Sequence, residues 1–339
     1  MIESHNNQNK ITNPQKTSED KKQEVNLRPE SFADFIGQQE LIDNLKVYIK
    51  AALKRKESLD HVLLFGPPGL GKTTLAKIIS KEMKVNFKMS SGPVLEKAGD
   101  LAGMLTNLDA HDVFFIDEVH RLRTVIEEYL YSAMEDYSID IILDKGPNSR
   151  SVVLNLNPFT LVGATTQLGK LTSPLRDRFG VILRLDYYSK EELVEIIVRS
   201  SKILNIKIDQ KGAKEIAKRS RGTPRVANRI LRRARDFAEV ESNGVVTYEV
   251  ADLCLSRIGI DSKGLDDMDR RILETIINKF SGGPVGVESL SVAISEDSVT
   301  IEEVYEPYLI KEGYLQRTTR GRIALDKAYK YCGISKNKN

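Results

Sequence analysis

GPPGLGKT, residues Gly66–Thr73, satisfies the phosphate-binding pattern G-x-x-x-x-G-K-[ST] and decides the fold of this chain. The preceding residues His61–Phe65 are typical of a short buried strand, and Thr74–Ile79 has apolar residues at helical spacing. A strand, a glycine turn and a helix N-terminus together form an anion site, because backbone N–H groups and the helix dipole favour phosphate. In this context a chance glycine turn is a poor alternative, and we predict that the chain binds a nucleoside triphosphate.

The chemistry expected at this loop extends to a second apolar run. Lys72 is expected to reach the β- and γ-phosphates of ATP, and the Thr73 hydroxyl to ligate Mg²⁺. The run Val113–Ile116 ends in Asp117 and Glu118, and ligands lie at the carboxyl ends of parallel strands. We therefore predict that Asp117 holds Mg²⁺, directly or through water, and that Glu118 orients or deprotonates the attacking water. Helix capping or simple surface charge is the alternative for this carboxylate pair.

The rest of the chain divides by pattern. Strands alternating with helices continue to about residue 187, which predicts an α/β domain with a parallel sheet covered on both faces. The next region shows helical periodicity and no strand pattern. A polar linker follows, and then three helices and two short strands, which is the outline of a winged helix. The predicted divisions are a disordered tail at 1–25, a large ATPase domain at 26–188, a small helical lid at 189–260 and a winged-helix head at 261–339.

Composition limits the function class. With 40% hydrophobic and 29% charged residues, and no apolar run of about 18 residues or recognisable signal peptide, the 339-residue chain reads as a cytoplasmic protein without a membrane span. Cys254 and Cys332 lie far apart and the four histidines form no cluster, so nothing indicates a zinc site or a disulfide. A net charge of +3 does not by itself indicate nucleic-acid binding. From Gly313 onward, however, the sequence contains seven Lys or Arg residues and one acidic residue, Asp326, and such local basicity is typical of a DNA-binding surface.

Two further sets of residues are candidates for the hydrolytic step. ATP motors commonly receive an arginine in trans that neutralises the γ-phosphate in the transition state. Arg178, just before Phe179 and a predicted strand, is the better of two arginines in Ser173–Gly180, although it also fits a solvated helix end. Either Thr165 or Thr166 is expected to contact the attacking water or the γ-phosphate, unless both are only structural.

Arginines later in the chain suggest coupling and output. Arg225 lies in the first turn of a predicted helix, where it either reaches nucleotide from the second domain or is one exposed arginine of a basic helix. Arg317, Arg320 and Arg322 lie on or beside a tight turn with two threonines. Such a hairpin is suited to phosphate contacts on DNA, which give affinity without reading sequence; the alternative is a solvated hairpin.

Taken together, these stretches resemble the AAA+ ATPases, and among them the RuvB family of bacterial Holliday-junction branch-migration motors. The resemblance extends over roughly residues 26 to 334. The phosphate loop alone indicates only an NTPase. The three stretches nearest the C-terminus, Ser220–Arg229, Gly282–Gly286 and Gly313–Arg322, are together far more specific. The stretches that carry the resemblance are Leu27–Phe32, Phe35–Gln38, Gly66–Thr74, Phe115–Leu122, Met134–Tyr137, Val162–Thr166, Arg178–Gly180, Ser220–Arg229, Gly282–Gly286 and Gly313–Arg322.

The resemblance implies a homohexameric ring around duplex DNA that works with RuvA on a Holliday junction, with RuvC in a larger complex. It makes Arg178 the trans arginine, Thr166 the first sensor and Arg225 the second, and it implies that Arg317 and Arg322 contact DNA. The 139–156 hairpin would dock on RuvA. Ser298 departs from a basic residue found in some members, and no DNA contact is expected there. The implied nucleotide contacts are Leu27, Arg28, Gly69, Lys72, Thr73, Thr74, Glu135, Asp136, Tyr137, Arg178, Tyr188 and Arg225.

Two other functions compete with an ATP-driven DNA translocase. A clamp loader or remodeller would need a collar domain or substrate pore loops, and neither is recognisable in the sequence. An ATP-gated regulator that reads DNA sequence would need base-reading polar side chains on its recognition helix. Val287–Ile294 offers mainly Glu288, Ser289 and Ser291, a poor set for base readout.

Overall fold

The computed structural model describes residues 11–14, 27–142 and 151–335, which form two compact units. Residues 28–186 make up the first unit, and residues 187–339 together with 1–27 make up the second. Most of the predicted tail at 1–25 lies outside the described residues. Within that tail, however, the side chains of Ile11 and Thr12 are buried.

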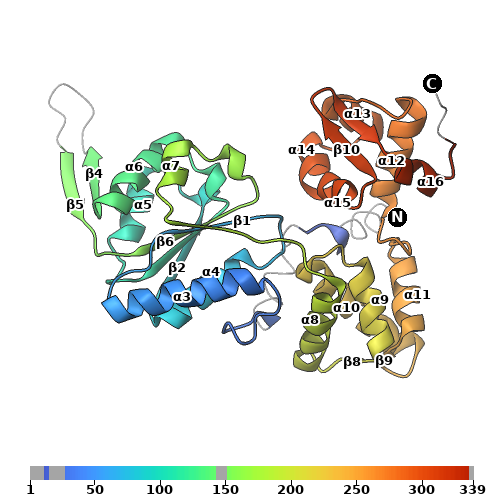
Figure 1. The fold of residues 1–339 in the computed structure, drawn as a ribbon, viewed down its shortest axis with the longest axis horizontal. Helices are drawn as coiled ribbons and strands as arrows, with labels where there is room; N and C mark the ends of the chain where they lie inside the picture. The colour runs from blue at the N-terminus through green and yellow to red at the C-terminus, as the bar shows by residue number, and fades with distance from the viewer. Residues whose placement is uncertain (1–10, 15–26, 143–150, 336–339) are drawn as a thin grey trace. The chain divides into compact units, whose positions relative to one another are not determined.

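A five-stranded parallel sheet forms the centre of the first unit, as predicted (Figure 1). Its strand order is β2-β3-β6-β1-β7, so β1, which leads into the phosphate loop, lies between β6 and β7. All four strand pairs are parallel, and the carboxyl ends of the strands therefore share one edge. The strands are β1 (Val62–Phe65), β2 (Phe87–Ser91), β3 (Val113–Asp117), β6 (Thr160–Thr165) and β7 (Val181–Arg184).

Helices cover both faces of this sheet, since the side chains of each buried strand alternate between the faces. Leu63, Phe114 and Leu161 project from three neighbouring strands into one fully buried cluster with α5, α6 and α7. Figure 1 shows α3 and α4 on the opposite side of the sheet. α5 was not predicted from the sequence. The helices are α3 (Gln39–Arg55), α4 (Lys72–Met83), α5 (Ala98–Leu105), α6 (Thr124–Glu135) and α7 (Ser173–Asp177), with short 3-10 turns at Gly92–Val94, Val119–Arg121 and Leu168–Lys170.

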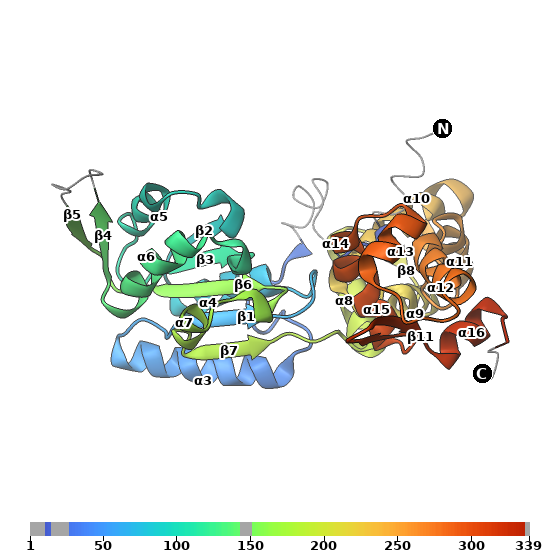
Figure 2. The same ribbon diagram turned by 90° about the horizontal axis from the view of Figure 1, so that it is seen from above.

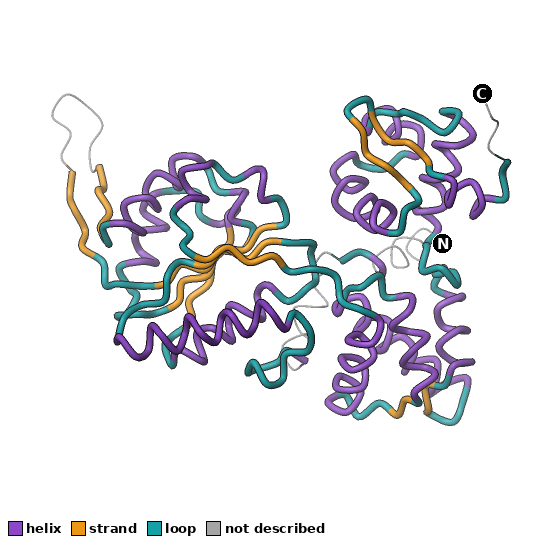
Figure 3. The backbone as a smooth tube through the Cα atoms, in the orientation of Figure 1, coloured by secondary structure: helices purple, strands orange, loops and turns teal. Residues whose placement is uncertain are grey.

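The predicted hairpin at 139–156 is also present. Strands β4 (Ser138–Ile142) and β5 (Ser151–Asn155) pair antiparallel and stand apart from the main sheet (Figure 3). Its base is anchored because Ile139 and Leu156 are buried in the α5–α6–α7 cluster. The tip at 143–150 lies outside the described residues.

The second unit begins with a helical part whose prediction needs one correction. Helices dominate it, but β8 (Lys207–Ile208) and β9 (Val245–Val246) form a short parallel pair. The helix-only prediction was wrong here because two-residue strands leave no periodic signal in the sequence. The helices are α8 (Lys190–Ile203), α9 (Gln210–Arg219), α10 (Pro224–Glu241) and α11 (Tyr248–Arg257), and Figure 2 shows them from above.

The winged-helix fold predicted for the C-terminal part of this unit is confirmed. Its wing strands pair antiparallel with Thr318 opposite Gly321, so only Thr319 and Arg320 lie between the paired ends. Gly321 has φ 132°, and a Cβ there would lie 2.3 Å from the Val285 carbonyl oxygen, so only glycine fits. A closing helix, α16, was not predicted. The elements are α12 (Asp267–Lys279), α13 (Val287–Ile294), α14 (Ser298–Thr300), a π-helical turn (Ile301–Tyr305), α15 (Glu306–Lys311), β10 (Leu315–Thr318), β11 (Gly321–Ala324) and α16 (Asp326–Cys332).

Candidate nucleotide site and DNA-binding hairpin

The phosphate loop is shaped by glycines that no other residue can replace without strain. Gly66 has φ 142°, and a Cβ there would lie 2.3 Å from the Leu185 carbonyl oxygen. Gly71, with φ 104°, precedes the first residue of α4. Lys72 Nζ is buried within the loop and donates to the carbonyl oxygens of Gly66 at 2.7 Å and Pro67 at 2.8 Å. The sequence thus builds a loop that encloses its own cation at a helix N-terminus, an arrangement suited to phosphate.

Two oxygen donors meet beside this loop. Thr73 follows Lys72 on α4, and its Oγ1 donates to Asp117 Oδ2 at 3.5 Å. Asp117 is the last residue of β3, so the parallel sheet brings it to the loop across 44 residues of chain. A hydroxyl and a carboxylate are hard oxygen ligands of the kind Mg²⁺ takes in phosphate sites, where it keeps several waters and binds few protein groups. The pair therefore has the oxygen donors that a Mg²⁺ ion would take.

Glu118 leaves the strand in an unusual conformation. Its φ of 51° and ψ of 45° lie in the left-handed region, which residues other than glycine seldom adopt. Its carboxylate accepts from Arg121 Nη1 at 3.0 Å and is about half exposed. The turn directs Glu118 away from the line of the strand, and in this structure Arg121 holds its side chain.

The two candidate sensor threonines differ in their surroundings. Thr165 ends β6 in a buried position, where its hydroxyl lies 3.0 Å from His120 Nδ1 and accepts from the Gln167 N–H. Burial lowers the pKa of His120, so its neutral form is favoured beside this hydroxyl. Thr166 is exposed immediately after the strand. Because Thr165 already serves a structural contact, Thr166 stays the sensor candidate.

Arg178 directly follows α7 as its C-cap residue, and its side chain contacts one face of α6. Its guanidinium carbon lies 4.5 Å from the centre of the Tyr131 ring, and Nη2 donates to Glu135 Oε2 at 3.0 Å. Nη1 donates to the Pro174 carbonyl oxygen at 2.7 Å, whereas Nε is buried without a hydrogen-bond partner. The side chain is 23% exposed, so the alternative of a fully solvated helix-end arginine does not describe it.

The same face of α6 also fixes the start of α7. The Thr172 hydroxyl donates to the buried Glu127 carboxylate at 2.6 Å and accepts from the Leu175 N–H, which caps α7. Tyr131 Oη lies 3.1 Å from that hydroxyl. Glu127, Tyr131 and Glu135 follow at four-residue intervals and therefore share one face of the helix. Sequence reasoning missed Tyr131 and Thr172 because nothing local marks them.

The remaining predicted nucleotide contacts fall in both units. Asp136 and Tyr137 follow Glu135 at the end of α6, and Tyr137 (φ 47°) contacts the Phe159 ring edge-on. Leu27 and Tyr188 are buried in the second unit, where the Tyr188 N–H donates to the Gly222 carbonyl oxygen at 3.0 Å. The first unit contains Arg28, Gly69, Lys72, Thr73, Thr74, Glu135, Asp136, Tyr137 and Arg178; the second contains Leu27, Tyr188 and Arg225.

The wing does not present all its arginines to solvent. Arg317 lies opposite Arg322 across the hairpin and is 56% exposed. Arg322 is only 7% exposed, and its guanidinium is paired with the buried Glu306 and with Glu302. Arg320 is exposed at the turn. In this structure two carboxylates from the preceding helical segment hold the charge of Arg322, and the DNA contact expected of it stays a prediction.

Three family models together match nearly the whole described chain. They are described as the Holliday junction DNA helicase RuvB P-loop domain, matching residues 27–185, the RuvB AAA lid domain, matching 188–261, and the RuvB C-terminal winged helix domain, matching 262–333. The Holliday junction branch migration complex subunit RuvB of Flavobacterium johnsoniae is 58% identical over 316 residues, which cover 93% of each chain. The chain belongs to the RuvB family.

Solved structures of the RuvB family agree with this assignment. The Thermotoga maritima RuvB Holliday junction branch migration motor is 48% identical, with a TM-score of 0.83, and the match covers 91% of this chain and 99% of that one. A mutant of the same T. maritima RuvB gives a TM-score of 0.84 at the same identity and coverage. The family establishes a P-loop ATPase with a lid and a winged helix. The clamp-loader and sequence-reading-regulator alternatives are thereby set aside.

Among the described residues, no helix is both long enough and apolar enough to cross a bilayer. No group of three or more His, Cys, Asp or Glu side chains within the described ranges is arranged to hold a metal ion.

Proposed function

We propose that this protein is an ATP-driven DNA translocase that migrates Holliday junctions as part of a homohexameric ring. The observation that carries the proposal is the convergence of Lys72, Thr73 and Asp117 at one edge of the sheet in a member of the RuvB family. Lys72 and Thr73 begin α4, and Asp117 ends β3, a strand that does not pair with β1. Their arrangement supports the triphosphate and Mg²⁺ chemistry of an ATPase.

In the proposed reaction, Lys72 exchanges its loop carbonyls for the β- and γ-phosphates of ATP. Mg²⁺ neutralises phosphate charge when bound, and Thr73 and Asp117 would hold it. Glu118 orients the attacking water after its side chain leaves Arg121, and Thr166 reports the γ-phosphate. The loop amides and Thr74 at the start of α4 position the phosphates, so the protein contributes mainly placement and electrostatic stabilisation.

The trans arginine is the reason for proposing a ring. Arg178 is held at the end of α7 by Tyr131 and Glu135 of its own subunit. We propose that it serves the nucleotide site of a neighbouring subunit, as Arg225 serves its own site from the lid. The F. johnsoniae relative is described as a branch migration complex subunit. That description supports partner subunits, for which we propose RuvA on the 139–156 hairpin and RuvC in a larger assembly.

DNA contact is proposed for the wing. Arg317 and Arg320 are the two exposed arginines there. Arg322 ties the hairpin to the preceding helical segment through Glu302 and Glu306.

A cytoplasmic location and the domain limits 26–188, 189–260 and 261–339 are also proposals.

An ATP-dependent branch-migration assay on a synthetic four-way junction tests the proposal. The full chain with RuvA is expected to dissociate the junction when ATP and Mg²⁺ are present. Omission of RuvA should reduce the rate, and Lys72→Ala should abolish it. No ATP-dependent dissociation with RuvA present would reject the proposed function.

A further inference from the structure

A short segment near the N-terminus, Ile11–Pro14, which we call the N-terminal anchor, packs within the second unit against α10 and the start of α12. It lies outside the residues matched by the family models, which begin at 27. The Ile11 side chain is 9% exposed and that of Thr12 only 1%. Two of its four side chains are therefore buried although the flanking sequence is polar. We infer that the segment binds a specific surface of the protein.

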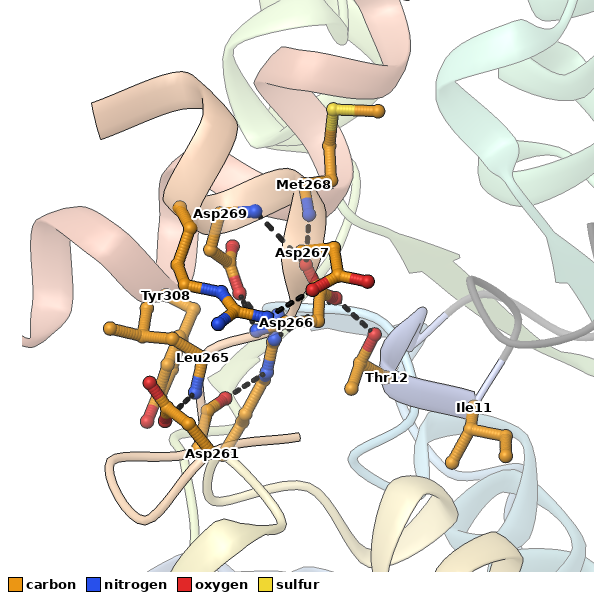
Figure 4. Close-up of polar contacts among 12 residues, drawn as sticks. Ile11, Thr12, Asp261, Leu265, Asp266, Asp267, Met268, Asp269 and Tyr308 are labelled. Carbon is orange, nitrogen blue, oxygen red and sulfur yellow. Dashed lines mark hydrogen bonds and ion pairs between the residues drawn. The ribbon is translucent and has the colours of Figure 1, made fainter. Parts of the chain in front are cut away.

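The first part of that surface is the N-terminus of α12. Thr12 Oγ1 donates to Asp266 Oδ2 at 2.5 Å, a contact drawn in Figure 4. Asp266 also caps α12 by accepting from the N–H groups of Met268 and Asp269. The hydroxyl of the anchor thereby joins a hydrogen-bonded network that already exists at the start of the winged-helix part.

The network is held together by a buried cation. Arg221 donates to Asp266 at 3.1 Å and pairs with the fully buried Asp269. Burial raises the pKa of Asp269 to about 8. An uncompensated carboxylate would be costly in this environment. The hydroxyl of Thr12 donates to the second carboxylate, Asp266, and so adds to the satisfaction of this buried cluster.

The second part of the surface is the first two turns of α10. Arg225 Nη1 donates to the Pro14 carbonyl oxygen at 2.6 Å. Arg229, four residues later on the same helix face, donates to the carbonyl oxygens of Ile11, at 3.5 Å, and Asn13. The anchor therefore offers backbone carbonyls to two arginines while its hydroxyl is fixed to Asp266.

We propose that the N-terminal anchor is a built-in competitor for Arg225, which holds this arginine until the phosphates of a bound nucleotide displace it. The inference rests on the nucleotide role proposed for Arg225. A guanidinium bonds more strongly to a phosphate than to a neutral carbonyl, because both partners are then charged. The anchor therefore weakens ATP binding without preventing it, and it ties the state of Arg225 to the α12 end through Thr12.

The test uses full-length variants that loosen the anchor without touching α10. Thr12→Val removes only the hydroxyl that reaches Asp266, and Ile11→Asp disfavours burial of the segment. Both are expected to tighten binding of a fluorescent, non-hydrolysable ATP analogue about fivefold, the low end of typical coupling between sites. Val292→Ala, at a side chain 82% exposed on the same unit, should leave the affinity unchanged.

Combination with Arg225→Ala separates the possible outcomes. In that background the anchor variants should give no further gain, since the competition has been removed. Two results would overturn the anchor proposal: Thr12→Val and Ile11→Asp bind the analogue no more tightly than the unchanged protein, or they tighten binding equally when Arg225 is replaced by alanine. If Arg225→Ala is itself defective in ATP binding, either result rejects the anchor proposal alone and leaves the nucleotide role of Arg225 in place. If Arg225→Ala binds and hydrolyses ATP normally, the proposed nucleotide role of Arg225 fails, and the anchor proposal fails with it.

Discussion

The phosphate loop and the wing hairpin are both short, positively charged turns, but they hold their charge in different ways. In the loop, Lys72 is enclosed by carbonyls of residues five and six positions before it. In the wing, Arg322 is enclosed by Glu302 and Glu306, residues from another element. The loop keeps its cation ready for an anionic ligand, because neutral carbonyls are easily exchanged for phosphate. The wing has already neutralised one of its cations within the fold.

Arg178 and Arg317 extend this comparison to the arginines proposed to act on a partner. Arg178 is positioned by an aromatic ring and one partly exposed carboxylate, so its charge is oriented. Arg317 is more exposed and shares Glu302 with Arg322. The number of positive residues in a segment is therefore a poor guide to its available charge. Availability depends on which carboxylates the tertiary structure brings alongside.

The largest expected effect comes from removal of the oriented arginine. Arg178→Ala should lower the rate of ATP hydrolysis about 10³-fold, since a trans arginine is worth roughly 10³ to 10⁵ in rate. ATP affinity should change little, because the arginine acts in a neighbouring site. Steady-state hydrolysis and equilibrium nucleotide binding, measured on the same preparation, check both parts. Arg176→Ala, two residues earlier in α7, is the matched control. A normal rate for Arg178→Ala would contradict the trans-arginine assignment.

Removal of the buried wing arginine should chiefly affect stability. Arg322→Ala leaves Glu306, whose side chain is 2% exposed, without its main partner, and we expect a loss of about 3 kcal/mol in the free energy of unfolding. Arg317→Ala should cost less than about 1 kcal/mol, as is usual for an exposed ion pair. Urea denaturation of both variants gives the comparison. Equal, small losses would show that Arg322 is not structurally held in solution.

The buried His61, just before β1, should make the stability of the protein depend on pH. His61 Nδ1 accepts from the Leu161 N–H at 2.9 Å and Nε2 lies 3.1 Å from the Met134 carbonyl oxygen, an arrangement that needs the neutral ring. Burial lowers the pKa of His61. The unfolded chain therefore binds this proton first, and stability is lost as pH falls below about 6.5, by at most about 1.4 kcal/mol per pH unit. Chemical denaturation between pH 7 and pH 5 measures the slope. A His61→Gln variant should lose this component, and an unchanged slope would contradict it.

The smallest expected effect concerns the ring beneath Arg178. Tyr131→Leu removes the cation–π contact and should lower the hydrolysis rate about fivefold, in line with roughly 1 kcal/mol for such a contact. Tyr131→Phe keeps the ring and loses only the hydroxyl near Thr172, so it should restore most of that rate. ATP affinity should be unchanged in both variants. Equal rates for Leu and Phe would show that the ring does not position Arg178.

Local patterns predicted most of the first unit because its signals lie within a few residues of one another. The strand at Val62–Phe65, the glycine turn and α4 follow one another directly in the sequence. The continuous apolar run before Asp117 is typical of a strand that is buried on both faces of a parallel sheet. α5 and the β8–β9 pair were missed. A strand of two residues offers no periodicity, and its pairing depends on a segment almost 40 residues away.

The candidate site was predictable to the extent that it depends on motif residues. Lys72, Thr73 and Asp117 lie together as the parallel-sheet argument requires. Tyr131 was not predicted, because an aromatic residue on a helix usually packs in a core and only the position of α7 gives this one a guanidinium. The role of each of these residues in ATP hydrolysis stays a proposal until the variants are measured.

The sequence by itself determined a phosphate loop between a strand and a helix, an α/β domain followed by a lid and a winged helix, and membership in the RuvB family. These follow from short-range patterns and conformational limits, such as the glycines that alone tolerate the loop geometry. The tertiary structure alone decided which charges are available. It buried Arg322 between two glutamates, oriented Arg178 on Tyr131, and placed the N-terminal anchor on Arg225. Ion pairs and burial depend on distance in space, and chain separation does not encode that distance.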